Sequence, residues 1–217
     1  MRVRDRMTLN PITVEPTTPV AEALRLMEGR KIRRLPVLQE SQLVGIVTLL
    51  DLMRVSASPA TTLSVYELRY LLDKLTVQEA MTRRVITVSP DAPIEQAALL
   101  MREHKIGGLP VVEDGRLVGI ITETDIFDAF VELLGMRKPG LRLEVDCPDR
   151  PGVLARIASV IAGRGLNIHS VVTTPAPSGQ AHLVFRVQGD DVGALASELE
   201  RSVEQCRVRW EAPASAA

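Results

Sequence analysis

The stretch GIVTLLDL at residues 45–52 returns as GIITETDI at residues 119–126, with Gly, Ile, Thr and Asp at the same places. Residues Val3 to Leu52 align without a gap with Val77 to Ile126, at an offset of 74 residues. The two segments carry the same residue at 22 of these 50 positions. Self-similarity at a fixed period over such a length indicates a duplicated structural unit. The chain therefore begins with two copies of one fold.

Each copy is predicted to form a β-α-β-β-α unit. A short extended piece precedes a helix that should begin at Pro19 in the first copy and at Pro93 in the second, because proline is favoured at the first helical position. Apolar residues then follow at helical spacing, namely Val20, Ala23, Leu24 and Met27, and Ile94, Ala97, Ala98 and Met101. Two apolar runs in each copy predict strands, and Asp114-Gly115 predicts a hairpin turn. The two copies should pack across a pseudo-twofold axis.

The motifs of the copies resemble a known family. The Leu-Pro-Val at 35–37 and 109–111 and the tandem Leu-Val-Gly-Ile-x-Thr-x-x-Asp endings are similar to a pair of CBS domains, the nucleotide-sensing Bateman module. The segment 62–81 resembles the connector of acetoin-utilization proteins of the AcuB type. This resemblance implies an adenosine-containing regulatory ligand, with AMP, ADP or ATP favoured, no required cofactor, and a link to acetoin catabolism.

The Thr and Asp of the repeated motif admit two interpretations. Thr48 and Asp51, like Thr122 and Asp125, can cap the helix that follows the strand. The same carboxylate can accept hydrogen bonds from two ribose hydroxyls, and the two roles are compatible. By the CBS resemblance, the candidate nucleotide-binding residues are Ile12, Thr13, Arg33, Arg34, Pro36, Thr48, Asp51, Arg54, Ile86, Thr87, Gly108, Pro110, Thr122 and Asp125.

The copies differ in charge beside this motif. The first has the basic run Arg30-Lys31-Ile32-Arg33-Arg34, whereas the second has His104-Lys105-Ile106-Gly107-Gly108 and carries Glu123 inside its motif. We therefore expect phosphorylated adenosine ligands to prefer the cleft near Arg33, Arg34 and Arg54. The alternative, that the basic run is only a solvated face, stays open.

A third segment follows the break at Lys138-Pro139-Gly140. From Leu141 the pattern predicts strand, helix, strand, strand, helix and strand, which is the ferredoxin-like βαββαβ order. The helical faces expected to be buried consist of Leu154, Ile157, Ala158 and Ile161, and of Val192, Leu195, Ala196, Leu199 and Val203. In this order the first and last strands are neighbours, which brings Cys147 toward Cys206. A reducing cytosol would keep them as thiols.

The stretch Asp149-Arg150-Pro151-Gly152-Val153-Leu154, with Gly165-Leu166-Asn167-Ile168 after the helix, resembles an ACT domain, a small regulatory module that often binds amino acids. Asp149 can cap the helix, Pro151 fits its first turn, and Gly152 lets a ligand approach the helix amides. The resemblance gives as candidate amino-acid-binding residues Asp149, Arg150, Pro151, Gly152, Val153, Leu154, Asn167 and Ile168. The alternative, a loop that only turns the chain and forms an oligomer contact, stays open.

Composition excludes several function classes. The net charge of −1 and the aromatic content of 3% give no support for nucleic-acid binding, and no apolar run is long enough to span a membrane. The sequence contains no HExxH, P-loop or Rossmann motif, no catalytic residue pattern and no cysteine-histidine metal site. We therefore expect a cytoplasmic protein that is not an enzyme and binds no metal, nucleic acid or membrane.

The predicted organisation has a mixed α+β and α/β fold class. It comprises CBS repeat 1 at 1–58, a connector helix region at 59–76, CBS repeat 2 at 77–137, a linker at 138–140, an ACT domain at 141–211 and a flexible tail at 212–217. The leading hypothesis is a small-molecule sensor in which the ACT domain forms a homodimer, with a tetramer as the larger alternative, and an unknown protein target reads the ligand state. The alternative is an assembly or interaction protein with no physiological ligand.

Overall fold

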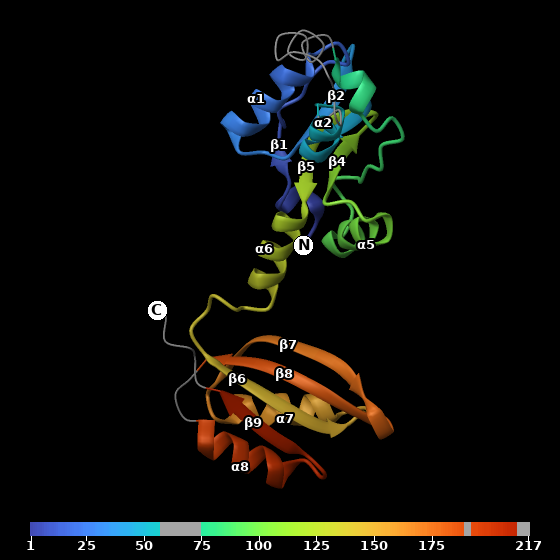
Figure 1. Cartoon of the computed structure of the whole chain (residues 1–217). Helices are drawn as coiled ribbons and strands as arrows, with labels where there is room; N and C mark the ends of the chain where they lie inside the picture. The colour runs from blue at the N-terminus through green and yellow to red at the C-terminus, as the bar shows by residue number, and fades with distance from the viewer. Residues whose placement is uncertain (57–74, 189–191, 212–217) are drawn as a thin grey trace. The chain divides into compact units, whose positions relative to one another are not determined.

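A computed structural model describes residues 1–56, 75–188 and 192–211, and it divides into one unit at Met1–Ile126 and another at Phe127–Ala217 (Figure 1). Most of the connector helix region predicted at 59–76, and the tail at 212–217, lie outside the described residues. In the part of the chain that is described, no helix is long and apolar enough to cross a membrane. The mixed α/β fold class is confirmed.

The first unit contains both copies. The elements of the first copy are the 3-10 helix η1 (Val3–Asp5), β1 (Thr8–Leu9), α1 (Val20–Arg30), β2 (Arg34–Gln39), β3 (Gln42–Thr48) and α2 (Leu49–Ser56). Those of the second are α4 (Val77–Ala80), α5 (Ile94–His104), β4 (Gly108–Glu113), β5 (Arg116–Thr122) and α6 (Glu123–Leu133), which continues into the second unit. Each prediction of two strands between two helices is therefore confirmed.

Local details follow the same pattern in both copies. Val14 and Val88, which precede the long helices, each form a single parallel bridge, to Val37 and to Val111. The helices begin one residue later than predicted, because Pro19 and Pro93 are N-cap residues with extended ψ values of 140° and 143°. The α1 face is buried at three of its four predicted positions, with Leu24 partly buried against the same core.

Both hairpins turn through residues with positive φ. Asp114 and Gly115 have φ values of 49° and 77°, as a type I′ turn requires, so the predicted turn is confirmed. Glu40 and Ser41 adopt nearly the same values, 48° and 67°, without a glycine. The fold therefore imposes this turn on the first copy although its residues do not favour it.

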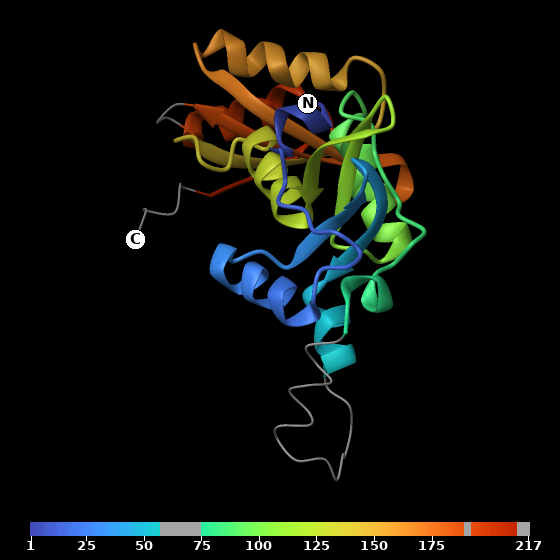
Figure 2. The same cartoon turned by 90° about the horizontal axis from the view of Figure 1, so that it is seen from above.

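The beginning of each copy is bonded to the other copy. β1 pairs antiparallel with β5, with Thr8 opposite Ile120 and Leu9 opposite Gly119. In the equivalent position, Thr82 and Ile46 exchange two backbone hydrogen bonds of 2.9 and 3.0 Å. Figures 1 and 2 show the N-terminal segment, in dark blue, beside the yellow-green strands of the second copy. The reciprocal pairing shows the pseudo-twofold relation that the repeat predicts.

Two glycines of the repeated motif permit this reciprocal pairing of each copy's beginning with the other copy, which we call the crossing. A Cβ atom on Gly45 would lie 2.5 Å from the Sδ of Met81, and one on Gly119 would lie 2.7 Å from the Sδ of Met7. Non-bonded side-chain atoms do not approach so closely. A Cβ on Gly119 would also lie 2.9 Å from the backbone oxygen of Thr8. The Gly of the motif is therefore needed for contact between the copies.

The second unit is a four-stranded antiparallel sheet covered on one face by two helices (Figure 1). Its elements are β6 (Leu141–Pro148), α7 (Val153–Gly163), β7 (Asn167–Ala176), the 3-10 helix η2 (Pro177–Gly179), β8 (Gln180–Gln188), α8 (Val192–Ser202) and β9 (Arg207–Glu211). The strand order is β7-β8-β6-β9, so the first and last strands are neighbours, as the predicted βαββαβ order requires.

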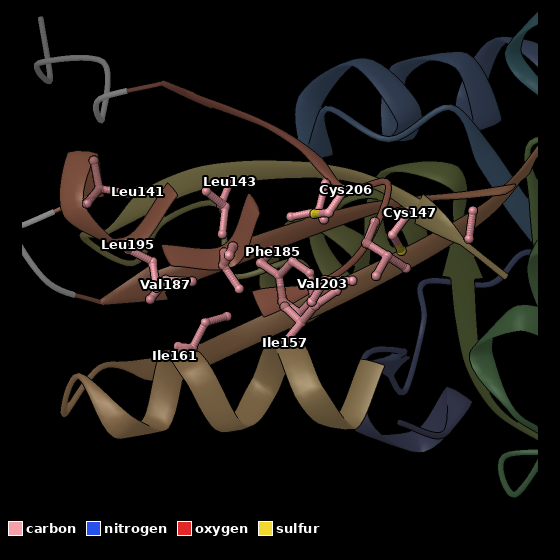
Figure 3. Close-up of a cluster of buried hydrophobic side chains, with 14 residues drawn as sticks. Leu141, Leu143, Cys147, Ile157, Ile161, Phe185, Val187, Leu195, Val203 and Cys206 are labelled. Carbon is pink, nitrogen blue, oxygen red and sulfur yellow. The ribbon is translucent and has the colours of Figure 1, made fainter. Parts of the chain in front are cut away.

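The core of this unit lies between the sheet and the helices (Figure 3). Ile157 and Ile161 of α7 are fully buried against Phe185 and Leu195. Leu154, predicted to lie on the same face, is 44% exposed, because the buried stripe of α7 includes Val153 and Val160 instead. That part of the predicted face was wrong.

Cys147 and Cys206 are both buried in this core as free thiols (Figure 3). Burial, and to a smaller extent the neighbouring Cys147, Glu200 and Asp146, together raise the pKa of the Cys206 thiol to about 11. Burial, Asp146 and Asp149 likewise raise the pKa of Cys147. The folded unit therefore disfavours both thiolates.

We predict that an Ala at position 45 or 119 weakens the association of the two copies. Gly45→Ala and Gly119→Ala should each lower the free energy of unfolding by roughly 1–3 kcal/mol, because the added methyl group must displace a packed methionine. Calorimetric unfolding measures this loss. Gly29→Ala is the matched control, since a Cβ there would meet no atom within 4 Å. A cost for Gly45→Ala no greater than for Gly29→Ala would contradict the role of the crossing.

We also predict that the thiols stay unreactive in the folded protein at pH 8, and that denaturation without reductant exposes both to an alkylating reagent. The stabilising effect of the raised Cys206 pKa is fully present below its ordinary value of 9.0 and is lost as the pH rises toward about 11. Urea unfolding measured across this pH range should show that the free energy of unfolding falls less in Cys206→Ala than in the unaltered protein. Recovery of no thiols after denaturation would instead indicate a disulfide.

Candidate functional site: two clefts between the copies

The repeated Asp caps the helix that follows it in both copies. The Oδ2 of Asp51 accepts hydrogen bonds from the Thr48 amide at 3.0 Å and from the Thr48 hydroxyl at 2.6 Å. The Oδ2 of Asp125 accepts the equivalent bonds from Thr122, both at 2.7 Å. In the described residues, the Oδ1 of each carboxylate has no hydrogen-bond partner. The predicted cap is therefore present, and it leaves one oxygen of each Asp available.

Each Asp lines a cleft. The cleft at Asp125, which we call the Asp125 cleft, has a volume of about 370 Å³. Its lining residues are Thr8, Asn10, Pro11, Ile12, Lys31, Ile32, Arg33, Arg34, Ile120, Thr122, Thr124 and Asp125. The cleft at Asp51, the Asp51 cleft, has a volume of about 310 Å³. It is lined by Arg34, Ile46, Thr48, Asp51, Thr82, Arg84, Val85, Ile86, Lys105, Ile106, Gly107, Gly108 and Pro110.

Each cleft combines residues of both copies. The Asp125 cleft takes its Thr and Asp from the second copy but its isoleucines 12 and 32 from the first. The Asp51 cleft reverses this, with isoleucines 86 and 106 from the second copy. This mixing follows from the crossing, because β1 and the bridge at Thr82 carry the beginning of each copy to the central strand of the other.

The predicted site residues divide accordingly. The Asp125 cleft brings together Ile12, Arg33, Arg34, Thr122 and Asp125, and the Asp51 cleft brings together Arg34, Thr48, Asp51, Ile86, Gly108 and Pro110. The other four, Thr13, Pro36, Arg54 and Thr87, line neither cleft. Thr13 instead lines a separate hollow with Glu15, Thr18 and Glu22.

The predicted charge contrast between the copies needs correction. Arg33 and Arg34 lie with Asp125, and not in one cleft with Arg54, because the loop after α1 faces the other copy. The Asp51 cleft is not poor in cations either, since Arg84 and Lys105 line it together with Arg34. Three cationic residues therefore line each cleft.

Several lining residues were missed from the sequence. Lys31 and Lys105 are equivalent in the repeat, and both end their helices in a left-handed conformation with φ of 54°. Glycine is the usual residue there, so a retained lysine is a signal for a role of its side chain. Thr8 and Thr82, also identical between the copies, line the two clefts in the same way.

Arg34 differs from the other cations because it lines both clefts. Its equivalent in the second copy is Gly108, and a Cβ there would lie 2.9 Å from the Cδ of Arg34. Burial lowers the pKa of the Arg34 guanidinium, Arg33 lowers it further, and the carboxylates of Glu123 and Asp125 oppose this. Arginine remains charged under such shifts, so a partly buried positive charge lies between the clefts.

The loop before α7 in the second unit is arranged differently from the prediction. The N-cap residue is Gly152 with φ of 89°, and no side chain caps the helix, so Asp149 does not cap it and Pro151 precedes it. A Cβ on Gly152 would meet no atom within 4 Å, so the loop is open there. Asn167 is exposed, whereas Ile168 packs against the core. The structure places Arg150 next to Asp149 in this loop, with Val153 as the first residue of α7.

Comparison with known families agrees with this architecture. The CBS domain model matches residues 3–58 and 77–132, and the ACT domain model matches residues 141–204. The chain therefore belongs to the CBS domain proteins and carries a tandem CBS pair followed by an ACT domain.

Solved structures give more specific likenesses. The putative acetoin utilization protein AcuB from Vibrio cholerae is 34% identical with a TM-score of 0.52, covering 64% of this chain and 96% of that one. The CBS domain pair of protein MJ0100, solved with 5′-methylthioadenosine and S-adenosyl-L-methionine, is 34% identical with a TM-score of 0.52 and covers 61% and 97%. CBSX2, solved in complex with AMP, is 34% identical with a TM-score of 0.50 and covers 60% and 96%.

Among the curated relatives are enzymes. L-aspartate semialdehyde sulfurtransferase of Methanocaldococcus jannaschii is 35% identical over 130 residues, which is 59% of this chain but 23% of that protein. A CBS domain-containing protein of Dictyostelium discoideum is 31% identical over 134 residues, 61% of this chain and 92% of that protein. The chain thus spans about a quarter of the length of the sulfurtransferase.

Proposed function

We propose that this chain is a non-catalytic regulatory protein whose CBS pair binds adenosine-containing ligands in the two clefts. The observation that carries the proposal is the unpartnered Oδ1 of Asp51 and Asp125, each at a helix start inside a cleft. The MJ0100 pair and CBSX2, which share a third of its sequence over the CBS region, hold adenosine compounds. AMP, ADP and ATP are the favoured ligands.

The clefts offer a complementary group for each part of such a ligand. The two ribose hydroxyls donate to the Oδ1 of the Asp, which the cap already holds in place. The adenine base lies among the apolar residues Ile12, Ile32 and Ile120 in one cleft, and among Ile86, Ile106 and Ile46 in the other. Phosphate oxygens accept hydrogen bonds from the lysine and arginine side chains of the rim.

The ACT domain supplies the second part of the proposal. It pairs two copies of the chain into a homodimer, and the open loop at Gly152 receives the carboxylate of an amino acid. Ligand binding then changes the affinity for a protein target, which requires different contacts in the two states. The likeness to AcuB supports a role in the control of acetoin catabolism.

We predict that Asp51→Ala and Asp125→Ala each weaken adenosine binding at one cleft by about 10- to 100-fold, because a charged acceptor of two hydrogen bonds is lost. Isothermal titration with adenosine and with AMP measures the loss. Each variant also loses a helix cap, which costs about 1 kcal/mol of stability.

Glu79→Ala separates these two effects. Glu79 accepts hydrogen bonds from the amide and hydroxyl of Thr76 in the same kind of cap, but it lines neither cleft. This variant should lose stability and keep its affinity. If no adenosine compound, NAD, S-adenosylmethionine or amino acid raises the unfolding temperature, the sensing function fails and an assembly role takes its place.

A further inference from the structure

Arg34 occupies a position that two ligands would compete for. It begins β2, and its side chain reaches the rim of the Asp125 cleft and that of the Asp51 cleft. A Cβ on Gly107 would lie 2.6 Å from Nη2 of Arg34 and 2.9 Å from Oε2 of Glu123, so both side chains converge on this glycine. The guanidinium therefore lies over the loop of the second copy.

No carboxylate holds Arg34 in this position. Within residues 1–56, 75–188 and 192–211, its guanidinium has neither an ion pair nor a side-chain hydrogen bond, although Glu123 and Asp125 attract it at longer range. A partly buried cation without a partner gains from an anion that can reach it. Either cleft can supply that anion as the phosphate of a bound nucleotide.

The repeat does not supply a second arginine for this purpose. The positions equivalent to Arg33 and Arg34 are Gly107 and Gly108, and Arg34 fills the space beside them. A guanidinium binds a phosphate best through a bidentate contact along one edge of its planar fork, and turning that edge into one cleft turns it away from the other. A phosphate that draws Arg34 into one cleft removes it from the other.

We propose that Arg34 couples the two clefts, so that an anionic adenosine ligand in one lowers the affinity of the other for a second anionic ligand. A neutral nucleoside has no phosphate for Arg34 and is bound by the two clefts independently. This inference rests on the proposed function, because it requires both clefts to bind adenosine compounds.

Titration of the full chain with AMP and with adenosine tests the coupling. Asp51→Ala and Asp125→Ala each leave one working cleft and give its affinity in the absence of a second ligand. In the unaltered protein the product of the two stepwise AMP dissociation constants should exceed the product of these two separate dissociation constants by about fivefold or more. For adenosine the two products should agree.

Arg34→Gln identifies the residue responsible. In this variant, and in its combinations with the two Asp variants, the coupling for AMP should disappear and the products should agree. Arg33→Gln is the matched control, because it removes the same charge one residue away. Of the two clefts, Arg33 lines the Asp125 cleft alone. This variant should weaken AMP binding in that cleft and keep the coupling.

The outcomes separate the inference from the proposed function. Independent AMP binding at both clefts, or coupling that persists in Arg34→Gln, overturns the inference and leaves the proposed function standing. A single bound AMP that stays single in Arg34→Gln also overturns it, whereas a second AMP gained by that variant supports it. Absence of binding by every adenosine compound overturns both.

Discussion

The crossing of two methionines over two glycines is the contact on which the rest of the CBS pair depends. Met7 packs where a side chain on Gly119 would be, and Met81 packs where one on Gly45 would be. Only this close approach lets the beginning of each copy pair with the central strand of the other. The loops that follow then face the Asp of the opposite copy. Without the crossing, neither cleft would have its present walls.

The cap and the binding role of each Asp support one another physically. Two hydrogen bonds from Thr fix Oδ2, so the orientation of the carboxylate is set before any ligand arrives. Preorganisation of this kind lowers the entropy cost of binding, because no side-chain freedom remains to be lost. A single local motif thereby serves folding and recognition.

The sequence predicted what is local and periodic. The duplication, the Asp114-Gly115 turn, the βαββαβ order and the helix faces depend on neighbouring residues, and they are present except for Leu154 on the α7 face. The set of residues that line each cleft together was not predictable in this way. A shift by 74 residues shows which residues of the two copies are equivalent, but not which residues of one copy lie against the other. Arg54 was therefore grouped with Arg33, and Lys31 was overlooked. Asp149 failed as a cap because Gly152, three residues later and with positive φ, is the N-cap of α7.

A duplicated fold produces two equal clefts only where the side chains near both of them can also be duplicated. An arginine at position 108 would direct its side chain into the space that Arg34 occupies, where its Cβ would already lie 2.9 Å from Cδ. Two guanidinium groups there would add the repulsion of like charges to the steric conflict. Replacement of one by glycine removes both problems, but it leaves one cation for two sites. The asymmetry of the copies is thus a consequence of their symmetric packing, and it makes the two clefts dependent on each other.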